Sequence, residues 1–289
     1  MLALSLVFTD DWIIRWFGSY LQPASITWLS YGKTLMRVPL GVVGQGVGVA
    51  SFPFLAQLYS EGKIDEVNRL LNSTMKWMIA LLVPISALTI AQSSPVAYLV
   101  FSHTRLRGPD FDATASTLVL FSLGMFAWGA QNILARGFYA TRNTLTPAIV
   151  GTLLAFANLP VYWLLVRSHQ HLGLAFASSL GITAYTVVLF VLLNRRTHNR
   201  EAGAITLFFL KVCGASAAVA WVCHRLQIFL EPHFAWHTIP GAFTLLVIVT
   251  SVGIALLFVA AKLLGINEFD ELIARAWKKV PVEKAGIVP

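Results

Sequence analysis

Charge is what this sequence has least of. Only 12% of its residues are charged, while 57% are hydrophobic, whereas an average soluble domain carries roughly 25% charged residues. The apolar residues gather in long runs separated by short polar stretches, and a bilayer-crossing helix needs about 20 such residues. The shortage of charge therefore excludes an ordinary soluble domain. It predicts an all-α, polytopic transmembrane helix bundle.

Acidic residues are scarcest of all, because the chain has 13 of them against 21 lysines and arginines. By their positions, all of them lie between the apolar runs or at the edges of a run, including the neighbours Asp10 and Asp11. A carboxylate at mid-bilayer costs about 3 kcal/mol on insertion scales. We therefore expect no acid inside the membrane. The net charge of +8 is better explained by cytoplasmic loops beside anionic lipid than by nucleic acid, which we do not expect as a partner.

Catalytic and metal-binding patterns are also missing. Cys213 and Cys223 lie ten residues apart in one apolar run, roughly 15 Å along a helix, which is too far for a disulfide. His233 and His237 are four residues apart, but Pro232 and a short loop argue against a preformed metal site. With no phosphate-binding loop and no nucleophile–base–acid set, we predict no enzymatic activity, no metal and no cofactor.

The apolar runs predict seven transmembrane spans. Their approximate ranges are 30–57, 75–101, 114–138, 145–167, 172–194, 204–229 and 239–264. Met1–Phe8 is too short to span, and it reads as the tail of an earlier helix. Lysine and arginine are more abundant at one set of loops, which should be cytoplasmic. This places the N-terminus of the chain in the periplasm and its C-terminus in the cytoplasm.

Two segments outside the spans have helical, amphipathic patterns. Ser60–Thr74 carries several charges and is expected to be an amphipathic helix on the cytoplasmic surface. The tail at 266–280 places apolar residues opposite charges, which is typical of an interfacial helix.

The first span carries the most informative pattern. Lys33 and Arg37 are four residues apart, so they share a helix face. Pro39 removes a backbone donor and should kink the helix, and Gly44 and Gly48 have the spacing that permits close helix contact. Two cations in a span without acids favour an anionic ligand, and a diphosphate would serve.

Alternatives remain for each candidate residue. Lys33 can equally extend its amine to the outer headgroups, and amides within spans often join helices rather than bind ligands. The predicted substrate-binding residues are Lys33, Arg37, Gln45, Gln131, Asn132 and Arg136, with Gln57 and Asn158 as weaker candidates.

Three motifs make the sequence resemble a known family. Leu29–Tyr59 contains Tyr31, then Pro39-Leu40-Gly41, then a small-residue run ending in Pro53. A second motif is Arg107-Gly108-x-x-Phe111-Asp112 before a span. A third, Ala135–Pro147, ends one span in Arg-Gly-Phe-Tyr-Ala and starts the next with Thr-x-Thr-Pro. Their order and spacing resemble the C-terminal half of the MurJ/MviN lipid II flippase family, over about residues 1–265.

The resemblance implies a transporter of the multidrug/oligosaccharidyl-lipid/polysaccharide exporter superfamily. Such a protein would move the undecaprenyl-diphosphate-linked peptidoglycan precursor, lipid II, across the bacterial inner membrane during cell wall biogenesis, by alternating access. Membrane lipids and a missing N-terminal lobe would be its other partners. The family's usual cavity arginine falls at Thr34 here, between Lys33 and Arg37.

The same resemblance implies four regions. Residues 1–23 would be the remnant of a preceding helix and an outside loop, and 24–196 the helices of the C-terminal lobe. Residues 197–265 would be the last two transmembrane helices, forming a groove for the lipid tail, and 266–289 a cytoplasmic amphipathic tail.

Two other functions stay open. One is an O-antigen or polysaccharide-lipid flippase of the same superfamily, since only motifs distinguish it. A drug antiporter is disfavoured, because such proteins commonly need intramembrane carboxylates. The other is an inactive, truncated membrane scaffold.

Overall fold

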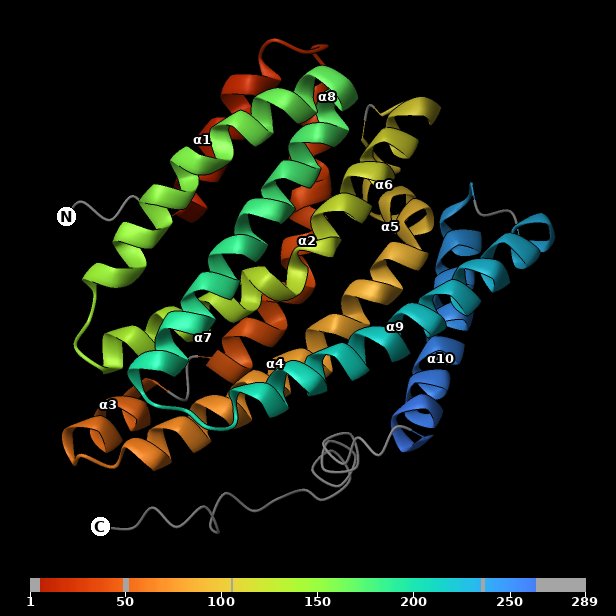
Figure 1. Cartoon of the computed structure of the whole chain (residues 1–289). Helices are drawn as coiled ribbons and strands as arrows, with labels where there is room; N and C mark the ends of the chain where they lie inside the picture. Colours follow the sequence, from red (N-terminus) through yellow and green to blue (C-terminus); the bar gives the residue numbers. More distant parts are fainter. Residues whose placement is uncertain (1–5, 49–51, 105, 235–236, 264–289) are drawn as a thin grey trace.

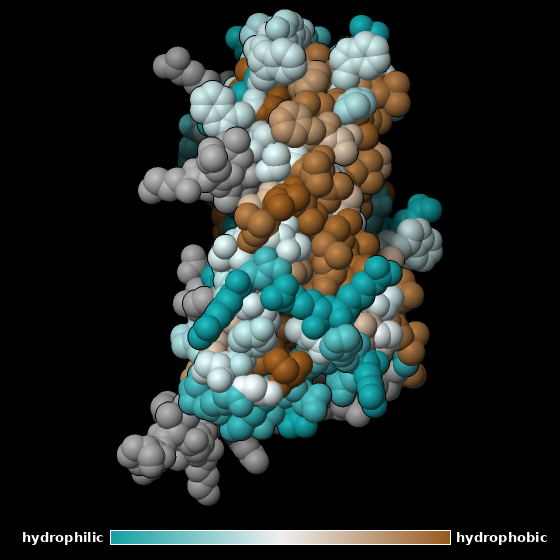
Figure 2. Space-filling model, turned by 60° about the vertical axis from the view of Figure 1, so that its left-hand side comes forward, coloured by the Kyte–Doolittle hydropathy of each residue, from teal (hydrophilic) through white to brown (hydrophobic). Residues whose placement is uncertain are grey.

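The computed structural model describes residues 6–48, 52–104, 106–234 and 237–263, and within these ranges every regular element is helical. Long helices run in one bundle, with α10 at its edge (Figure 1). Figure 2 shows an apolar surface adjoining hydrophilic residues gathered at one end, which is the pattern that a bilayer requires. The predicted all-α transmembrane bundle is confirmed.

The N-terminal part contains three helices. α1 covers Leu6–Gly18, α2 covers Ser25–Gly48 and α3 covers Phe52–Ser60. α2 continues through Pro39 without a break in its helical assignment. The predicted first span at 30–57 is thus divided between α2 and α3.

The middle of the chain forms two interrupted spans. α4 covers Ile64–Ala91 and is followed by α5, Ser93–Phe101; α6 covers Gly108–Leu123 and is followed by α7, Met125–Ala140. At the second break, Gly124 lies against Ser179, whose Cα is 3.0 Å from where a Cβ would be, so only glycine permits this approach.

The last three long helices complete the bundle. α8 covers Leu145–Arg196, α9 covers Ala202–Leu230 and α10 covers Ile239–Leu263, with a short 3-10 helix, η1, at Glu231–His233. α8 is two crossings, because Gln170 has non-helical angles of φ 50° and ψ −127°. Gly173 follows this reversal, and a Cβ there would lie 2.0 Å from the Leu165 carbonyl oxygen.

Five described helices are long and apolar enough to cross a membrane: Ile64–Ala91, Gly108–Ala140, Leu145–Arg196, Ala202–His233 and Ile239–Leu263. Because Leu145–Arg196 folds back at Gln170, these helices account for six of the predicted spans. The remaining one, at 30–57, carries two cations and many glycines, and it is not among the five.

The segment at 64–74 corrects the sequence prediction. The segment is helical and amphipathic as expected, with Asp65, Glu66 and Arg69 exposed and Val67 and Leu71 buried, but it is the beginning of α4 rather than a separate helix. Its polar side chains bind the turn between α8 and α9: Asn68 donates to the Thr197 carbonyl at 2.9 Å, and Asn72 donates to Glu201 at 3.0 Å. The sequence alone did not indicate these contacts, because the partners of Asn68 and Asn72 lie far away along the chain. The tail at 266–289 lies outside the described residues.

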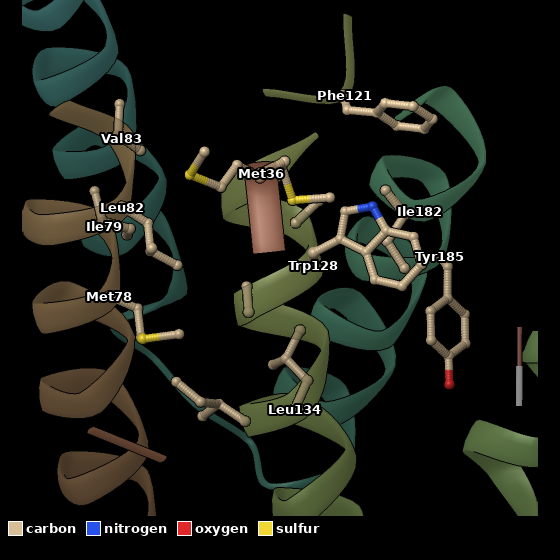
Figure 3. Packing of buried hydrophobic residues seen from close by; sticks show 14 of the residues in the cluster. Met36, Met78, Ile79, Leu82, Val83, Phe121, Trp128, Leu134, Ile182 and Tyr185 are labelled. Carbon is tan, nitrogen blue, oxygen red and sulfur yellow. The ribbon is translucent and has the colours of Figure 1, made fainter. Parts of the chain in front are cut away.

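One large hydrophobic core joins α1 through α9 and includes Ala261 of α10, and a smaller one joins α9 and α10 to the end of α4. In the large core, Trp128 reaches from α7 toward Ile182 and Tyr185 of α8, near Met36 of α2 (Figure 3). The core fixes α2 and α8 relative to each other, which positions the polar groups described next.

Candidate functional site

Two acids of α1 meet two cations of α2. The Lys33 ammonium donates hydrogen bonds to Asp10 and to Asp11, the latter at 2.6 Å. The Arg37 guanidinium donates from Nη2 to both oxygens of Asp11, at 2.9 and 3.1 Å. Lys33 and Arg37 are four residues apart and share one side of α2, whereas Asp10 and Asp11 are adjacent on α1 and point in different directions. Lys33 lies within reach of both acids, and Arg37 within reach of Asp11.

The Asp10–Lys33 pair is buried, with 5% and 6% of the two side chains exposed. Asp10 also accepts hydrogen bonds from the Tyr162 hydroxyl and, at 2.9 Å, from the Ser178 hydroxyl, both on α8. The Lys33 amine lies 5.0 Å from the centre of the Trp128 ring. Asp10 thus has three donors, as a buried carboxylate requires.

This pair corrects two sequence predictions. Asp10 lies inside the bundle, although all acids were expected between spans or at their edges, and Lys33 does not extend to headgroups. The physical reason is that a lysine and two hydroxyls offset the desolvation of the carboxylate.

The Asp11–Arg37 pair lies at the surface. Asp11 is 37% exposed and Arg37 45% exposed. Around Arg37, the exposed residues of α2 follow helical spacing and form one stripe, composed of Ser30, Thr34, Arg37, Val38, Gly41 and Val42. We call this stripe the open face of α2, and Arg37 belongs to it.

Gly41 and Gly44 have open space around them. No atom lies within 4 Å of where a Cβ would be at either position. The predicted close helix contact at Gly44 is therefore not made in the described part of the chain. Since a glycine face without a neighbour leaves backbone accessible, this part of α2 is suited to a ligand or a further segment of protein.

Three further predicted site residues, Gln131, Asn132 and Arg136, lie on α7. Gln131 is buried and donates weakly to the Trp128 carbonyl at 3.5 Å, while Asn132 is exposed and donates to the same carbonyl at 3.0 Å. One guanidinium nitrogen of Arg136, Nη1, is buried without a hydrogen-bond partner. No hydrogen bond or ion pair joins these described residues to Lys33 or Arg37.

The weaker candidates have local partners. Gln57 donates to Glu61 at 3.0 Å, and Asn158 donates to the Ala177 carbonyl at 3.1 Å, which joins the two halves of α8. The side chain of Gln45 lies outside the described part of the chain.

Sequence reasoning missed Asp10, Asp11, Tyr162 and Ser178. The signal for the acids was present, since Asp10-Asp11 is flanked by Leu-Val-Phe-Thr and Trp-Ile-Ile. A carboxylate pair in apolar surroundings needs cations nearby. The first predicted span contains two cations, Lys33 and Arg37, and no acid to pair with them. Nothing in the sequence distinguishes Tyr162 or Ser178 from other hydroxyls of the spans.

An apolar groove of about 380 Å³ lies elsewhere, between α4, α7, α8 and α9. Its walls include Ile90, Phe126 and Phe209, with Ala217 and Ala220 giving it room on the α9 side. α10 does not line it. The groove is suited to a hydrocarbon chain.

Comparisons with known proteins give the family. The family model described as lipid II flippase MurJ matches residues 1–244. The chain is 29% identical over 208 residues to a protein of Haemophilus influenzae named "Probable lipid II flippase MurJ", covering 70% of this chain and 41% of that one. It is 24% identical over 259 residues to a protein of the same name from Rickettsia prowazekii, covering 88% and 50%.

A solved structure shares the fold. The structure titled "Lipid II flippase MurJ, inward closed conformation" matches with a TM-score of 0.70 at 18% identity, over 93% of this chain and 52% of that one. The chain thus spans no more than about half the length of these known proteins. The extent of the family match, over 244 residues from the first, shows that this chain belongs to the lipid II flippase MurJ family.

Proposed function

We propose that this chain is one lobe of a lipid II flippase and that Arg37 contacts the diphosphate of its substrate. Arg37 carries the proposal because it is a half-exposed cation on the open face of α2. Guanidinium groups suit phosphate recognition, since their donors form a planar fork. Lys33 is enclosed by two carboxylates, so it holds the site in shape rather than meeting the substrate.

The transport itself needs no covalent chemistry. In transporters built from two repeats, the substrate site lies between them and opens alternately to either side. The chain spans about half of its relatives' length, so a second lobe is proposed to cover the open face of α2. Residues 24–196 are then the lobe's helices, and we propose no enzymatic step.

The substrate's lipid tail is proposed to lie in the apolar groove beside α9. The groove is lined by Phe126, Phe209 and the small residues of α9. Within the region 197–265, α9 contributes to this surface, whereas α10 supports α9 from behind through the smaller core. An isoprenoid chain there would stay in contact with apolar side chains while its headgroup crosses.

The location of the protein follows the same proposal. Five membrane-length helices indicate a multi-pass membrane protein, and the family places it in the inner membrane. The excess of lysine and arginine at one set of loops assigns the start of the chain to the periplasm and its end to the cytoplasm. Cysteine labelling at Ser19 and at His198 from either side would test this orientation.

The decisive experiment measures binding of purified lipid II to the chain in nanodiscs. Arg37→Ala is expected to weaken binding by about tenfold or more, because a charge-assisted contact contributes about 1.5–3 kcal/mol. Arg225→Ala is the matched control, because Arg225 is an exposed cation on α9, over the Trp221 ring. Equal binding by the Arg37 variant and the control would reject the assignment of Arg37.

A transport assay extends this result. In cells depleted of their resident flippase, a longer protein containing this chain should prevent lipid II accumulation, and its Arg37→Ala variant should not. Normal growth with the Arg37 variant would contradict the proposed role.

A further inference from the structure

The two acids of α1 are adjacent in sequence but differ in how they can exchange partners. Asp10 has three donors and is buried, so no ligand reaches it. Asp11 is 37% exposed and shares its oxygens between Lys33 and Arg37. Only Asp11 can release a partner to an incoming ligand without leaving a buried charge unpaired.

We propose that Asp11 is a built-in competitor for the anionic ligand at Arg37. The inference rests on the proposed function, since it concerns the same arginine. Before a ligand binds, the Asp11 carboxylate holds Nη2 of Arg37, so a diphosphate that first engages the other donors of the guanidinium must displace Asp11 from Nη2. The ligand must take over the guanidinium, and the carboxylate takes it back when the ligand leaves.

The hydrogen bonds make this exchange possible. Arg37 uses only Nη2 toward Asp11, while a guanidinium has five N–H donors, so the remaining donors are open to a diphosphate on the exposed side. When Arg37 turns away, Asp11 keeps the Lys33 ammonium at 2.6 Å. Lys33 is therefore the fixed partner of both acids and Arg37 the exchangeable one.

The local charge agrees with a competitor role. Asp10, Asp11, Lys33 and Arg37 sum to zero, so the empty cluster does not attract an anion strongly. Arg15, one turn beyond Asp11 on α1, is exposed and has no ion pair among the described residues. Removing the Asp11 charge leaves a net positive surface, which binds diphosphate more tightly but also releases it more slowly.

The test uses the chain in nanodiscs of zwitterionic lipid, with farnesyl diphosphate and inorganic pyrophosphate as probes. Asp11→Asn is expected to bind farnesyl diphosphate about threefold more tightly or better, the effect of losing a competing surface ion pair. Asp112→Asn removes the same charge from an exposed position of α6 and should leave affinity unchanged. A gain with both probes assigns the exchange to the diphosphate alone, and a gain with farnesyl diphosphate only assigns it to the lipid-borne group.

The double variant Asp11→Asn/Arg37→Gln separates the two proposals. If Asp11 competes at Arg37, its substitution gives no gain once Arg37 is gone. Unchanged or weaker binding by Asp11→Asn, or the same gain without Arg37, would overturn the competitor role and leave the proposed function intact. If Arg37→Gln alone does not weaken binding, the proposed function itself fails.

Folding provides a last criterion. Lys33 retains Asp10 in both Asp11→Asn and Asp11→Ser, so both variants should keep the helical content and unfolding temperature of the unsubstituted chain within a few degrees. Failure of both variants to fold would show that Asp11 is a structural residue and would refute the exchange.

Discussion

Each of the two ion pairs between α1 and α2 joins an aspartate to a cation, yet one pair is buried and the other is exposed. The cations lie one helical turn apart on α2, and the aspartates are adjacent on α1. Lys33 and Asp10 are closed off by Tyr162, Ser178 and the Trp128 ring. Arg37 and Asp11 are open at the surface. The comparison teaches that burial, rather than the type of charge, decides whether a cation is enclosed by the bundle or remains accessible at its surface.

The largest effect should come from breaking the buried pair on one side. Lys33→Met leaves Asp10 without its cation, and such a loss costs about 3–5 kcal/mol. The free energy of unfolding in mixed micelles would measure it. The double variant Asp10→Asn/Lys33→Met removes both charges and should recover most of this loss. If the single variant is as stable as the unsubstituted chain, the pair is not buried as described.

A smaller effect is expected from a hydroxyl that supports the same carboxylate. Tyr162→Phe removes a hydrogen bond to a charged group, worth about 1.5–3 kcal/mol. Tyr185→Phe is the control on the same helix, because its hydroxyl donates only to the neutral Pro147 carbonyl at 3.1 Å, a bond worth about 1 kcal/mol. Equal losses for the two variants would argue against a charged Asp10.

The smallest effect on stability should come from the exposed pair. Arg37→Gln removes an ion pair that is close to half exposed, and such pairs contribute about 1 kcal/mol or less. The same unfolding experiment would detect this contrast, and high salt should reduce it further. A loss as large as that of Lys33→Met would show that Arg37 is structural, and it would remove the contrast between the pairs.

The motifs and the transmembrane spans could be predicted because each depends on residues that are close together in the sequence. The Ala135–Pro147 motif forms the predicted turn between two spans, because α7 ends at Ala140 and α8 begins at Leu145. In the turn, Arg142 adopts a positive φ of 56°, and the Asn143 side chain accepts a hydrogen bond from the Thr146 backbone amide at 3.1 Å. The reversal of α8 was also expected, between spans 145–167 and 172–194, and it falls at Gln170. The amphipathic helix expected at 60–74 forms from Ile64, but the sequence did not show that it is part of α4 or that Asn68 and Asn72 bond to partners more than a hundred residues away.

By itself the sequence determined that this chain is an all-α membrane bundle, the approximate positions of most of its spans, and which cations stand out. Those properties follow from hydrophobic runs and local motifs, because membrane insertion and helix formation depend mainly on residues that are close together in the sequence. Only the tertiary structure decided that Lys33 is buried in an ion pair with Asp10 while Arg37 stays exposed to solvent. Desolvation of a charge depends on what α1 and α8 place around it, and that arrangement exists only when the helices have packed.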